Sequence, residues 1–297
     1  MKPCPACGAR SAETAYRLDG YDLLRCGACG LLFNGAFPPD ESKAAAFSEH
    51  YYHGVQSEAF RRTGKDYLSD PSVPVFRRWL ERLGPPGALL DVGCGLGTFL
   101  AVARDAGWTV SGLDVSPFAA KTVKETLGID VVAGSLADVP LPDASFDAVT
   151  MWDSIEHVDE PRRYLERARA LLKPGGVLLV ATDNFDCLGC DVARFAYAAT
   201  GGAVRYGMRK FYIPYNATYF TEARFRALLA ECGFEVETFE KMEYPLSKLN
   251  VSPLERALVA ALYAAAGATG RQAQFTLIAR AAGAREPGRT PGTVRRA

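Results

Sequence analysis

The stretch LLDVGCGLGTF, residues 89–99, passes from an apolar run through a turn with three alternating glycines into the start of an amphipathic segment. A buried strand followed by such a turn and then a helix is typical of the first strand of a parallel sheet. Because glycine has no side chain, the main chain can turn tightly there and a ligand can approach it closely. The stretch therefore predicts an α/β domain with a ligand site where its first strand ends.

Apolar runs and amphipathic segments alternate along the chain around this turn. We expect strands over residues 88–92, 109–113, 131–133, 146–152, 177–181, 234–239 and 274–279. We expect helices over residues 73–83, 98–106, 117–127, 161–172 and 222–232. Alternation of this kind predicts a mostly parallel sheet with helices on both faces.

The glycine spacing and the acid before it distinguish this turn from a dinucleotide site. Thr98 stands where the third glycine of the pattern G-x-G-x-x-G would lie, and Asp91 ends the first strand. A carboxylate at that point repels a pyrophosphate but suits a ligand that carries an ammonium group beside a sulfonium. S-adenosylmethionine (SAM) is such a ligand.

Two further strand ends supply groups for the adenosine part of SAM. Asp114 ends the second strand, where its carboxylate can accept hydrogen bonds from ribose hydroxyls. Residues 133–140 follow the third strand and can grip an adenine edge. Each acid alone could instead cap a helix or face solvent, but acids in register at successive strand ends favour a cofactor site. We assign these residues to it: Asp91, Gly93, Gly95, Gly97, Asp114, Val115, Ser135, Leu136 and Trp152.

Four of the eight cysteines form two C-x-x-C-G knuckles, at residues 4–8 and 26–30. The spacer between them has the length that zinc ribbons use, and residues 16–25 look like a short hairpin with a turn at Asp19-Gly20. No apolar leader is present, so thiolate ligands are expected rather than disulfides. We therefore expect an architectural zinc ion, because four thiolates leave no open coordination position. Its ligands would be Cys4, Cys7, Cys26 and Cys29.

These features divide the chain into four expected parts. The zinc ribbon takes residues 1–35, and a helical connecting region that covers the cofactor site takes residues 36–86. The sheet-forming domain takes residues 87–281 and contains an insertion over residues 183–220. A tail over residues 282–297, rich in glycine, proline and arginine, is expected to be disordered.

The composition argues against large anionic partners. Lys and Arg together number 34, as do Asp and Glu, so the net charge of the 297-residue chain is zero. Such a chain is not drawn to nucleic acid or to an anionic membrane by its overall field. Its longest apolar stretch toward the C-terminus, residues 257–266, is far shorter than a membrane span. We therefore expect a cytoplasmic protein with no membrane partner, and nucleic acid is not the expected substrate.

Five segments resemble class I SAM-dependent methyltransferases: DVGCGLG at residues 91–97, LDVS at 113–116, PLPDASFDAV at 140–149, EHV at 156–158 and LLKPGGVLLV at 171–180. The resemblance covers roughly residues 88–182 and is specific because the segments follow one another in the family's order. It implies a Rossmann-like sheet of seven strands, the last of them antiparallel to the others. It also implies cofactor contacts at Asp91, at Asp114 and at the three glycines of the turn.

Asp153, Glu156 and His157 follow the fourth expected strand, at the edge where a substrate would meet SAM. A neutral histidine there can accept a proton from the methyl acceptor. The segment is also similar to the E-x-x-E-H-V segment of ubiquinone-biosynthesis O-methyltransferases, which implies a divalent metal such as Mg²⁺. Here the first acid is an aspartate, which is one methylene shorter. We therefore weigh three roles for His157: a general base with the two acids beside it, a metal ligand together with them, or a structural histidine.

The insertion carries many aromatic rings among basic side chains, and such a lid would enclose a planar or anionic small molecule. Any one of these rings could instead belong to the insertion's own core. The pair Cys187 and Cys190 has no partner motif, so we assign it no metal.

We expect methyl transfer from SAM to an oxygen, nitrogen or carbon atom of a small-molecule metabolite, with His157 as general base. One alternative is an RNA methyltransferase that grips RNA with its zinc ribbon, against which the balanced charge counts. Another is a protein that binds SAM without catalysis, against which the intact Glu156-His157 pair counts.

Overall fold

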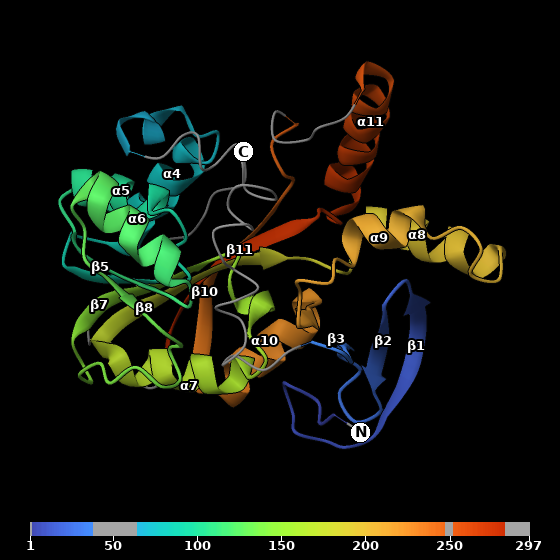
Figure 1. Ribbon diagram of the computed structural model, residues 1–297, viewed down its shortest axis with the longest axis horizontal. Coiled ribbons are helices and arrows are strands. Elements are labelled where there is room, and N and C mark those ends of the chain that lie inside the picture. The colour runs from blue at the N-terminus through green and yellow to red at the C-terminus, as the bar shows by residue number, and fades with distance from the viewer. Residues whose placement is uncertain (1, 38–63, 247–251, 283–297) are drawn as a thin grey trace.

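The computed structural model describes residues 2–37, 64–246 and 252–282 (Figure 1). Most of the expected connecting region and the tail after residue 282 lie outside the described residues. The described part of the connecting region contains the 3₁₀ helix η1 (Gly64–Ser69) and the helix α4 (Val73–Leu83). No helix among the described residues is long and apolar enough to cross a membrane.

The main sheet has seven strands in the order β10-β11-β8-β7-β4-β5-β6. Their bounds are Ala88–Val92 (β4), Thr109–Asp114 (β5), Val131–Ala133 (β6), Phe146–Trp152 (β7), Leu172–Asp183 (β8), Phe234–Met242 (β10) and Gln274–Ala281 (β11). The pairs β4–β5, β5–β6, β4–β7 and β7–β8 are parallel, whereas β11 runs antiparallel to both of its neighbours. The expected α/β fold, with seven strands and an antiparallel last strand, is confirmed.

Helices cover both faces of this sheet because successive residues of a buried parallel strand point to opposite sides. Leu89 packs with α4 and with α5 (Thr98–Asp105) on one face. Leu90 packs with α7 (Pro161–Leu171) and α10 (Glu222–Glu231) on the other. Figure 1 shows α4, α5 and α6 (Pro117–Leu127) on one side of the strands and α7 with α10 on the other.

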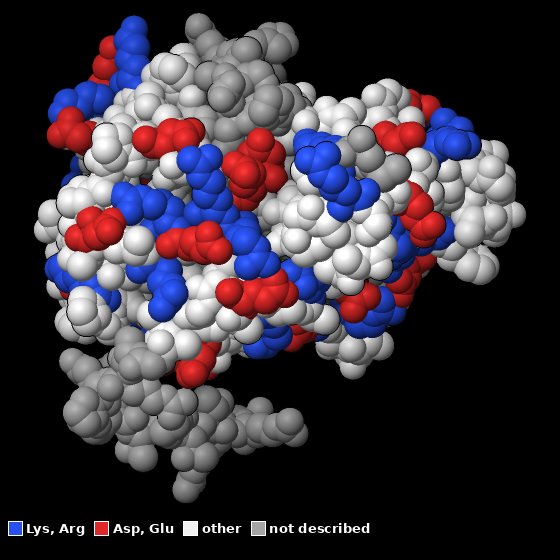
Figure 2. Space-filling view, turned by 90° about the horizontal axis from the view of Figure 1, so that it is seen from below, with Lys and Arg blue, Asp and Glu red and all other residues white. Residues whose placement is uncertain are grey.

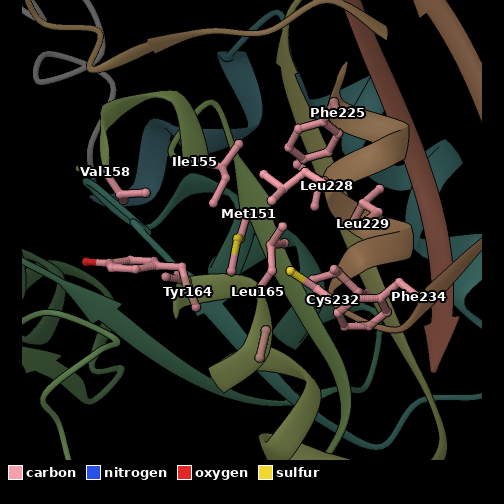
Figure 3. Close-up of a cluster of buried hydrophobic side chains, with 14 of the residues drawn as sticks. Met151, Ile155, Val158, Tyr164, Leu165, Phe225, Leu228, Leu229, Cys232 and Phe234 are labelled. Carbon is pink, nitrogen blue, oxygen red and sulfur yellow. The ribbon is translucent and has the colours of Figure 1, made fainter. Parts of the chain in front are cut away.

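The core on the α7 and α10 face is drawn in Figure 3. Met151 of β7 and Ile155 of the following turn point toward Leu165 of α7 and toward the α10 side chains Phe225 and Leu228, and all five are fully buried. This layer fixes the turn that follows β7 against two helices.

A second, four-stranded sheet lies beside the main one and has the order β1-β2-β3-β9. Its strands are Ala12–Leu18 (β1), Tyr21–Cys26 (β2), Leu32–Asn34 (β3) and Thr218–Tyr219 (β9). The hairpin expected around Asp19-Gly20 is present. The fourth strand was not expected, because β9 comes from the insertion, more than 180 residues away from β3 in the chain.

The insertion contains the helices α8 (Leu188–Ala199) and α9 (Tyr206–Phe211), and it packs against the four-stranded sheet. The buried rings of Phe185, Tyr212 and Tyr219 share one core with Leu23 of β2 and Leu32 of β3. Several of its aromatic residues therefore form a joint core with the N-terminal segment. Others, including Phe195 and Tyr206, are exposed.

The N-terminal segment also shares the core of the main sheet. Cys4, Cys26, Leu31 and Phe33 belong to the same buried cluster as the α7 and α10 residues of Figure 3. On the surface of that contact, Arg162 of α7 donates a hydrogen bond from Nε to the Ala6 carbonyl at 3.0 Å. The segment is thus continuous with the larger domain in packing.

The helix α11 (Pro253–Thr269) precedes β11 and was not expected from the sequence. Its alanine-rich apolar run lacks the period of an amphipathic helix. A capping box identifies its start, because Ser252 accepts from the Glu255 amide and the Glu255 carboxylate accepts from the Ser252 amide.

Replacing Leu165 with alanine tests the core of Figure 3. Leu165 is fully buried, so Leu165→Ala should lower the free energy of unfolding by about 3 kcal/mol through lost burial and a residual cavity. The matched control is Leu258→Ala on α11, where the side chain is 64% exposed. Urea unfolding of both variants measures the difference, and equal losses in the two would contradict the packing described here.

Candidate functional site

The three glycines of the turn after β4 have different surroundings, although all three have positive φ. A Cβ at Gly93 would lie 2.5 Å from Cβ of Ser154, and one at Gly97 would lie 2.9 Å from Cδ1 of Leu127. A Cβ at Gly95 would meet no atom within 4 Å. Gly93 and Gly97 therefore allow close packing within the protein, whereas Gly95 borders open space that a ligand can use.

Two buried carboxylates lie at the carboxyl ends of β4 and β5, beside this turn. Asp91 accepts a hydrogen bond from Thr150 Oγ1 at 2.7 Å, and burial raises its pKa to about 7. Asp114 accepts from the backbone amides of Gly95 and Ser116 at 2.8 and 2.9 Å. Burial also raises the pKa of Asp114, and these two amides act in the opposite direction. Within the described residues no lysine or arginine forms an ion pair with either acid.

The remaining residues assigned to the cofactor differ in what they can offer. Val115 follows Asp114 and is half-buried. Ser135 shares a hydrogen bond with the Tyr164 hydroxyl at 2.9 Å. The Leu136 side chain is fully buried in the core, which leaves its backbone for a ligand. Trp152 packs on the rings of Phe76 and Phe99.

The turn after β7 contains Asp153 and the short 3₁₀ helix η2 (Ile155–His157). Asp153 has a φ of 46°, a conformation that is uncommon for a residue other than glycine and that occurs preferentially at functional sites. Its Oδ1 accepts from Gln274 Nε2 of β11 at 2.8 Å. The side chain is exposed, so this acid lies at the surface of the strand edge.

Glu156 is buried under this turn. Its carboxylate accepts a hydrogen bond from Thr182 Oγ1 at 2.7 Å. Burial raises the pKa of Glu156 well above its usual value, and repulsion from Asp183 and Asp153 adds to the shift. The raised pKa favours the neutral form of the Glu156 carboxyl. A neutral carboxyl can hold the turn against β8 by its hydrogen bond to Thr182, but it offers a substrate no negative charge.

Sequence reasoning missed two residues at this edge of the sheet, Asp183 and its partner Tyr244. Asp183 ends β8 and accepts hydrogen bonds from the Tyr244 hydroxyl and from Asn216 Nδ2. Burial raises the pKa of Asp183, while these two donors oppose the rise. An acid directly after an apolar strand is the signal that identified Asp91 and Asp114, and it would have identified Asp183. Tyr244 gave no such signal because its position depends on how β10 pairs in the sheet.

His157 is held through its Nδ1 atom, which lies 2.9 Å from the backbone carbonyl oxygen of Tyr215. A carbonyl can only accept a hydrogen bond, so Nδ1 carries the proton and the lone pair of the neutral ring is on Nε2. This is the tautomer in which Nε2 can accept a proton.

The four cysteines of the two knuckles come together. All four sulfur atoms lie within 4.8 Å of one another, and two of the Sγ to Sγ distances are 3.6 Å. Tetrahedral zinc with bonds of about 2.3 Å separates its sulfurs by about 3.8 Å, which fits these distances. The two knuckles also share one backbone geometry: the amides of Gly8 and Gly30 donate to the carbonyls of Cys4 and Cys26.

The acids and the histidine after β7 do not form such a group. Among the described residues, the four cysteines are the only set of three or more metal-ligating side chains close enough to share an ion. Asp153, Glu156 and His157 are neighbours on one turn, but their ligand atoms do not come together as those of the four cysteines do. One atom of each side chain is hydrogen-bonded, to Gln274, Thr182 and the Tyr215 carbonyl respectively.

Comparison with known proteins places this arrangement in a family. A model of the methyltransferase domain matches residues 68–238. The chain is 31% identical over 170 residues to a ubiquinone biosynthesis O-methyltransferase of Xanthomonas axonopodis pv. citri, which covers 55% of the chain and 69% of that protein. It is 34% identical over 129 residues to a 2-methyl-6-phytyl-1,4-hydroquinone methyltransferase of Synechocystis, covering 40% of the chain and 41% of that protein. The first curated relatives are thus matched over about half of their length.

Among solved structures, a SAM-dependent methyltransferase from Archaeoglobus fulgidus shares the fold with a TM-score of 0.54 and 21% identity, covering 77% of this chain and 99% of that one. The family model spans more than half of the 297 residues. The chain therefore belongs to the methyltransferase domain family.

Proposed function

We propose that this protein transfers a methyl group from SAM to a small-molecule acceptor. The observation that carries this proposal is the pair of buried carboxylates, Asp91 and Asp114, beside the open turn at Gly95. Two buried acids that form no ion pair with any described lysine or arginine are costly in the absence of a ligand, and a ligand with positive charge and hydroxyl donors would offset that cost.

The cofactor site would be formed by the nine residues assigned to it from the sequence. Asp91 would face the positively charged methionine part, and Asp114 would accept from the ribose. The backbone at Gly95 and Leu136, together with Val115, Ser135 and Trp152, would surround the rest. When bound, SAM supplies a methyl carbon that is already activated for transfer.

His157 is the residue we propose as general base. The proton of the acceptor's O–H, N–H or C–H group would pass to Nε2 of His157 as the acceptor atom gains the methyl group that SAM would supply. Asp153 and Glu156 act beside it as binding and positioning groups. Magnesium assistance remains the alternative, and the metal-free base is favoured because the ligand atoms of the three side chains do not lie close together.

The acceptor is proposed to be a small metabolite, as the names of the Xanthomonas and Synechocystis relatives indicate for those proteins. The alternatives are RNA methylation and SAM binding without catalysis. Figure 2 shows acidic and basic side chains beside one another over the visible face, where a phosphate backbone would meet repulsion as well as attraction. The His157 tautomer favours catalysis over mere binding.

We also propose that the N-terminal segment binds one structural zinc ion through Cys4, Cys7, Cys26 and Cys29. The domain divisions expected from the sequence remain a proposal, with one refinement: residues 1–35 share their sheet with β9 of the insertion. The insertion would then serve both the zinc ribbon and the acceptor side of the site.

Transfer of labelled methyl from SAM tests the proposed activity. Purified protein is incubated with fractionated cell extract, and label is counted in small-molecule, RNA and protein fractions. We expect label in small molecules, and a loss of about 10²-fold or more in kcat for His157→Ala at unchanged SAM affinity. Glu160→Ala, an exposed change near the same turn, is the control. Label confined to RNA would overturn the substrate class, and undiminished turnover of His157→Ala would exclude the base role.

SAM affinity should depend on pH through Asp91. Burial raises the pKa of Asp91 to about 7, so the free protein loses the ionised form as the pH falls through that value. Only the ionised carboxylate attracts a cation, and the affinity should therefore fall by up to about tenfold per pH unit below pH of about 7. Calorimetric titrations across this range measure the effect. Asp91→Asn should bind weakly without this pH dependence, and a pH-independent affinity of the unmodified protein would argue against a role for Asp91.

Removal of zinc should destabilise the whole chain. The cysteines share the core of the main sheet, so loss of the ion disturbs packing beyond the knuckles. We expect elemental analysis to find one zinc ion per chain in the unmodified protein. In Cys4→Ser we expect less than one zinc ion per chain and a Tm lowered by several degrees. Cys232→Ser removes a thiol outside the quartet and should keep the metal. A zinc-free protein with an unchanged Tm would refute this structural role.

A further inference from the structure

One loop of the insertion is clamped between the N-terminal segment and the turn that carries His157. This bridging loop, residues 213–217, joins α9 to β9. From one side it is held by Asn34, the last residue of β3, which is 3% exposed. The backbone amide of Asn34 donates to the Ala217 carbonyl at 2.9 Å, and the side-chain Nδ2 donates to the Pro214 carbonyl at 3.1 Å.

The remaining polar atom of the Asn34 side chain is also engaged. Its Oδ1 accepts from the Ala36 amide at 2.9 Å, which fixes the orientation of the side-chain amide. Both carbonyls that Asn34 binds flank Tyr215 and Asn216. Asn34 thus fixes the bridging loop before and after the residue whose carbonyl faces His157.

From its other side, the same loop holds the turn after β7. The Tyr215 carbonyl lies 2.9 Å from Nδ1 of His157, and the Ala217 amide donates to the Glu156 carbonyl at 2.8 Å. Asn216 donates from Nδ2 to Asp183 at 3.3 Å. The contacts therefore run from β3 through the loop to the imidazole ring and to the end of β8.

We propose that Asn34 is a positioning residue for His157, so that the zinc-bearing segment orients the general base through the bridging loop. The proposal rests on the proposed role of His157 in catalysis. It gives the cysteine quartet a function beyond local stability, because the quartet and β3 lie in one buried cluster and β3 ends at Asn34.

The physical reason is the hydrogen bond between the imidazole ring and the loop. The Tyr215 carbonyl accepts from Nδ1 of His157 and so favours the Nδ1–H tautomer, and a shift of the bridging loop weakens that preference. Catalysis is sensitive to small displacements of the reacting groups, since a misplacement of about 1 Å can cost up to about 10²-fold in rate. The cofactor residues at β4 and β5 have no part in this chain of contacts, so SAM affinity should not change.

The test uses the full zinc-loaded chain and the variant Asn34→Asp. This change keeps the side-chain size but replaces the Nδ2 donor with an oxygen that repels the Pro214 carbonyl. Asn34→Ser is the milder second variant, because its shorter side chain withdraws the donor from the Pro214 carbonyl without adding charge. Glu13→Gln, an acid-to-amide change at an exposed position of β1, is the matched control.

Two quantities are measured after zinc content has been verified. The first is the ¹⁵N NMR spectrum of histidine-labelled protein, in which His157 is one of three histidines and is assigned with His157→Gln. The second is the pair of kinetic constants kcat and KM for SAM, which separates a loss of catalysis from a loss of cofactor binding. We expect loss of the single Nδ1–H tautomer and a fall in kcat of about tenfold in Asn34→Asp, with KM within about twofold of the unmodified protein.

The outcomes separate this proposal from the proposed function. An unchanged His157 spectrum in both Asn34 variants would overturn the positioning role, whatever the rates. A changed spectrum with an unchanged kcat would support the contact and reject His157 as the base. A fall in kcat with the same spectrum in zinc-loaded protein would also overturn the proposal, because the loss would then have a cause other than the tautomer.

Discussion

The burial of two carboxylates at the ends of neighbouring parallel strands is the constraint on which the site depends. The β4–β5 ladder brings Asp91 and Asp114 to one edge of the sheet, and the turn at Gly95 lies between them. Backbone amides and a threonine hydroxyl offset part of the desolvation of these acids. In the proposed cofactor site, positive charge from the ligand would offset the rest, which would link the fold to the kind of cofactor that binds.

The same sheet edge carries the groups that we propose to face the methyl acceptor. The strands β7 and β8 end at Asp153 and Asp183, and Glu156 lies buried between them. Burial, and then repulsion from Asp183 and Asp153, raises the pKa of Glu156. The three acids accept hydrogen bonds from Thr182, Gln274 and Tyr244. These hydrogen bonds hold the turn after β7 against β8 and β11. The bridging loop of the insertion contacts the same turn at Glu156 and His157.

Much of the main domain could be predicted because its strands are short apolar runs that end in glycine or acid. The bounds of α4, β4 and β7 agree with the expectation to the residue. The insertion could not be predicted in this way. Its strand β9 has two residues, and only pairing with β3 defines it. The contacts of Asn34 and Tyr215 likewise depend on tertiary packing between segments 180 residues apart.

The N-terminal cysteine segment shows a second limit of local patterns. The spacing of Cys4, Cys7, Cys26 and Cys29 was enough to predict that their sulfurs meet. It could not indicate what the segment packs against. The segment shares a core with α7 and α10 and pairs with a strand of the insertion.

The most direct test of the central claim is calorimetric titration of the purified full chain with SAM and, separately, with NAD. If the buried acids select a cationic ligand, one SAM binds per chain, Asp114→Ala weakens that binding by about tenfold or more, and NAD gives no binding heat. Binding of NAD without binding of SAM would contradict the account, because its pyrophosphate would then be accepted beside Asp91.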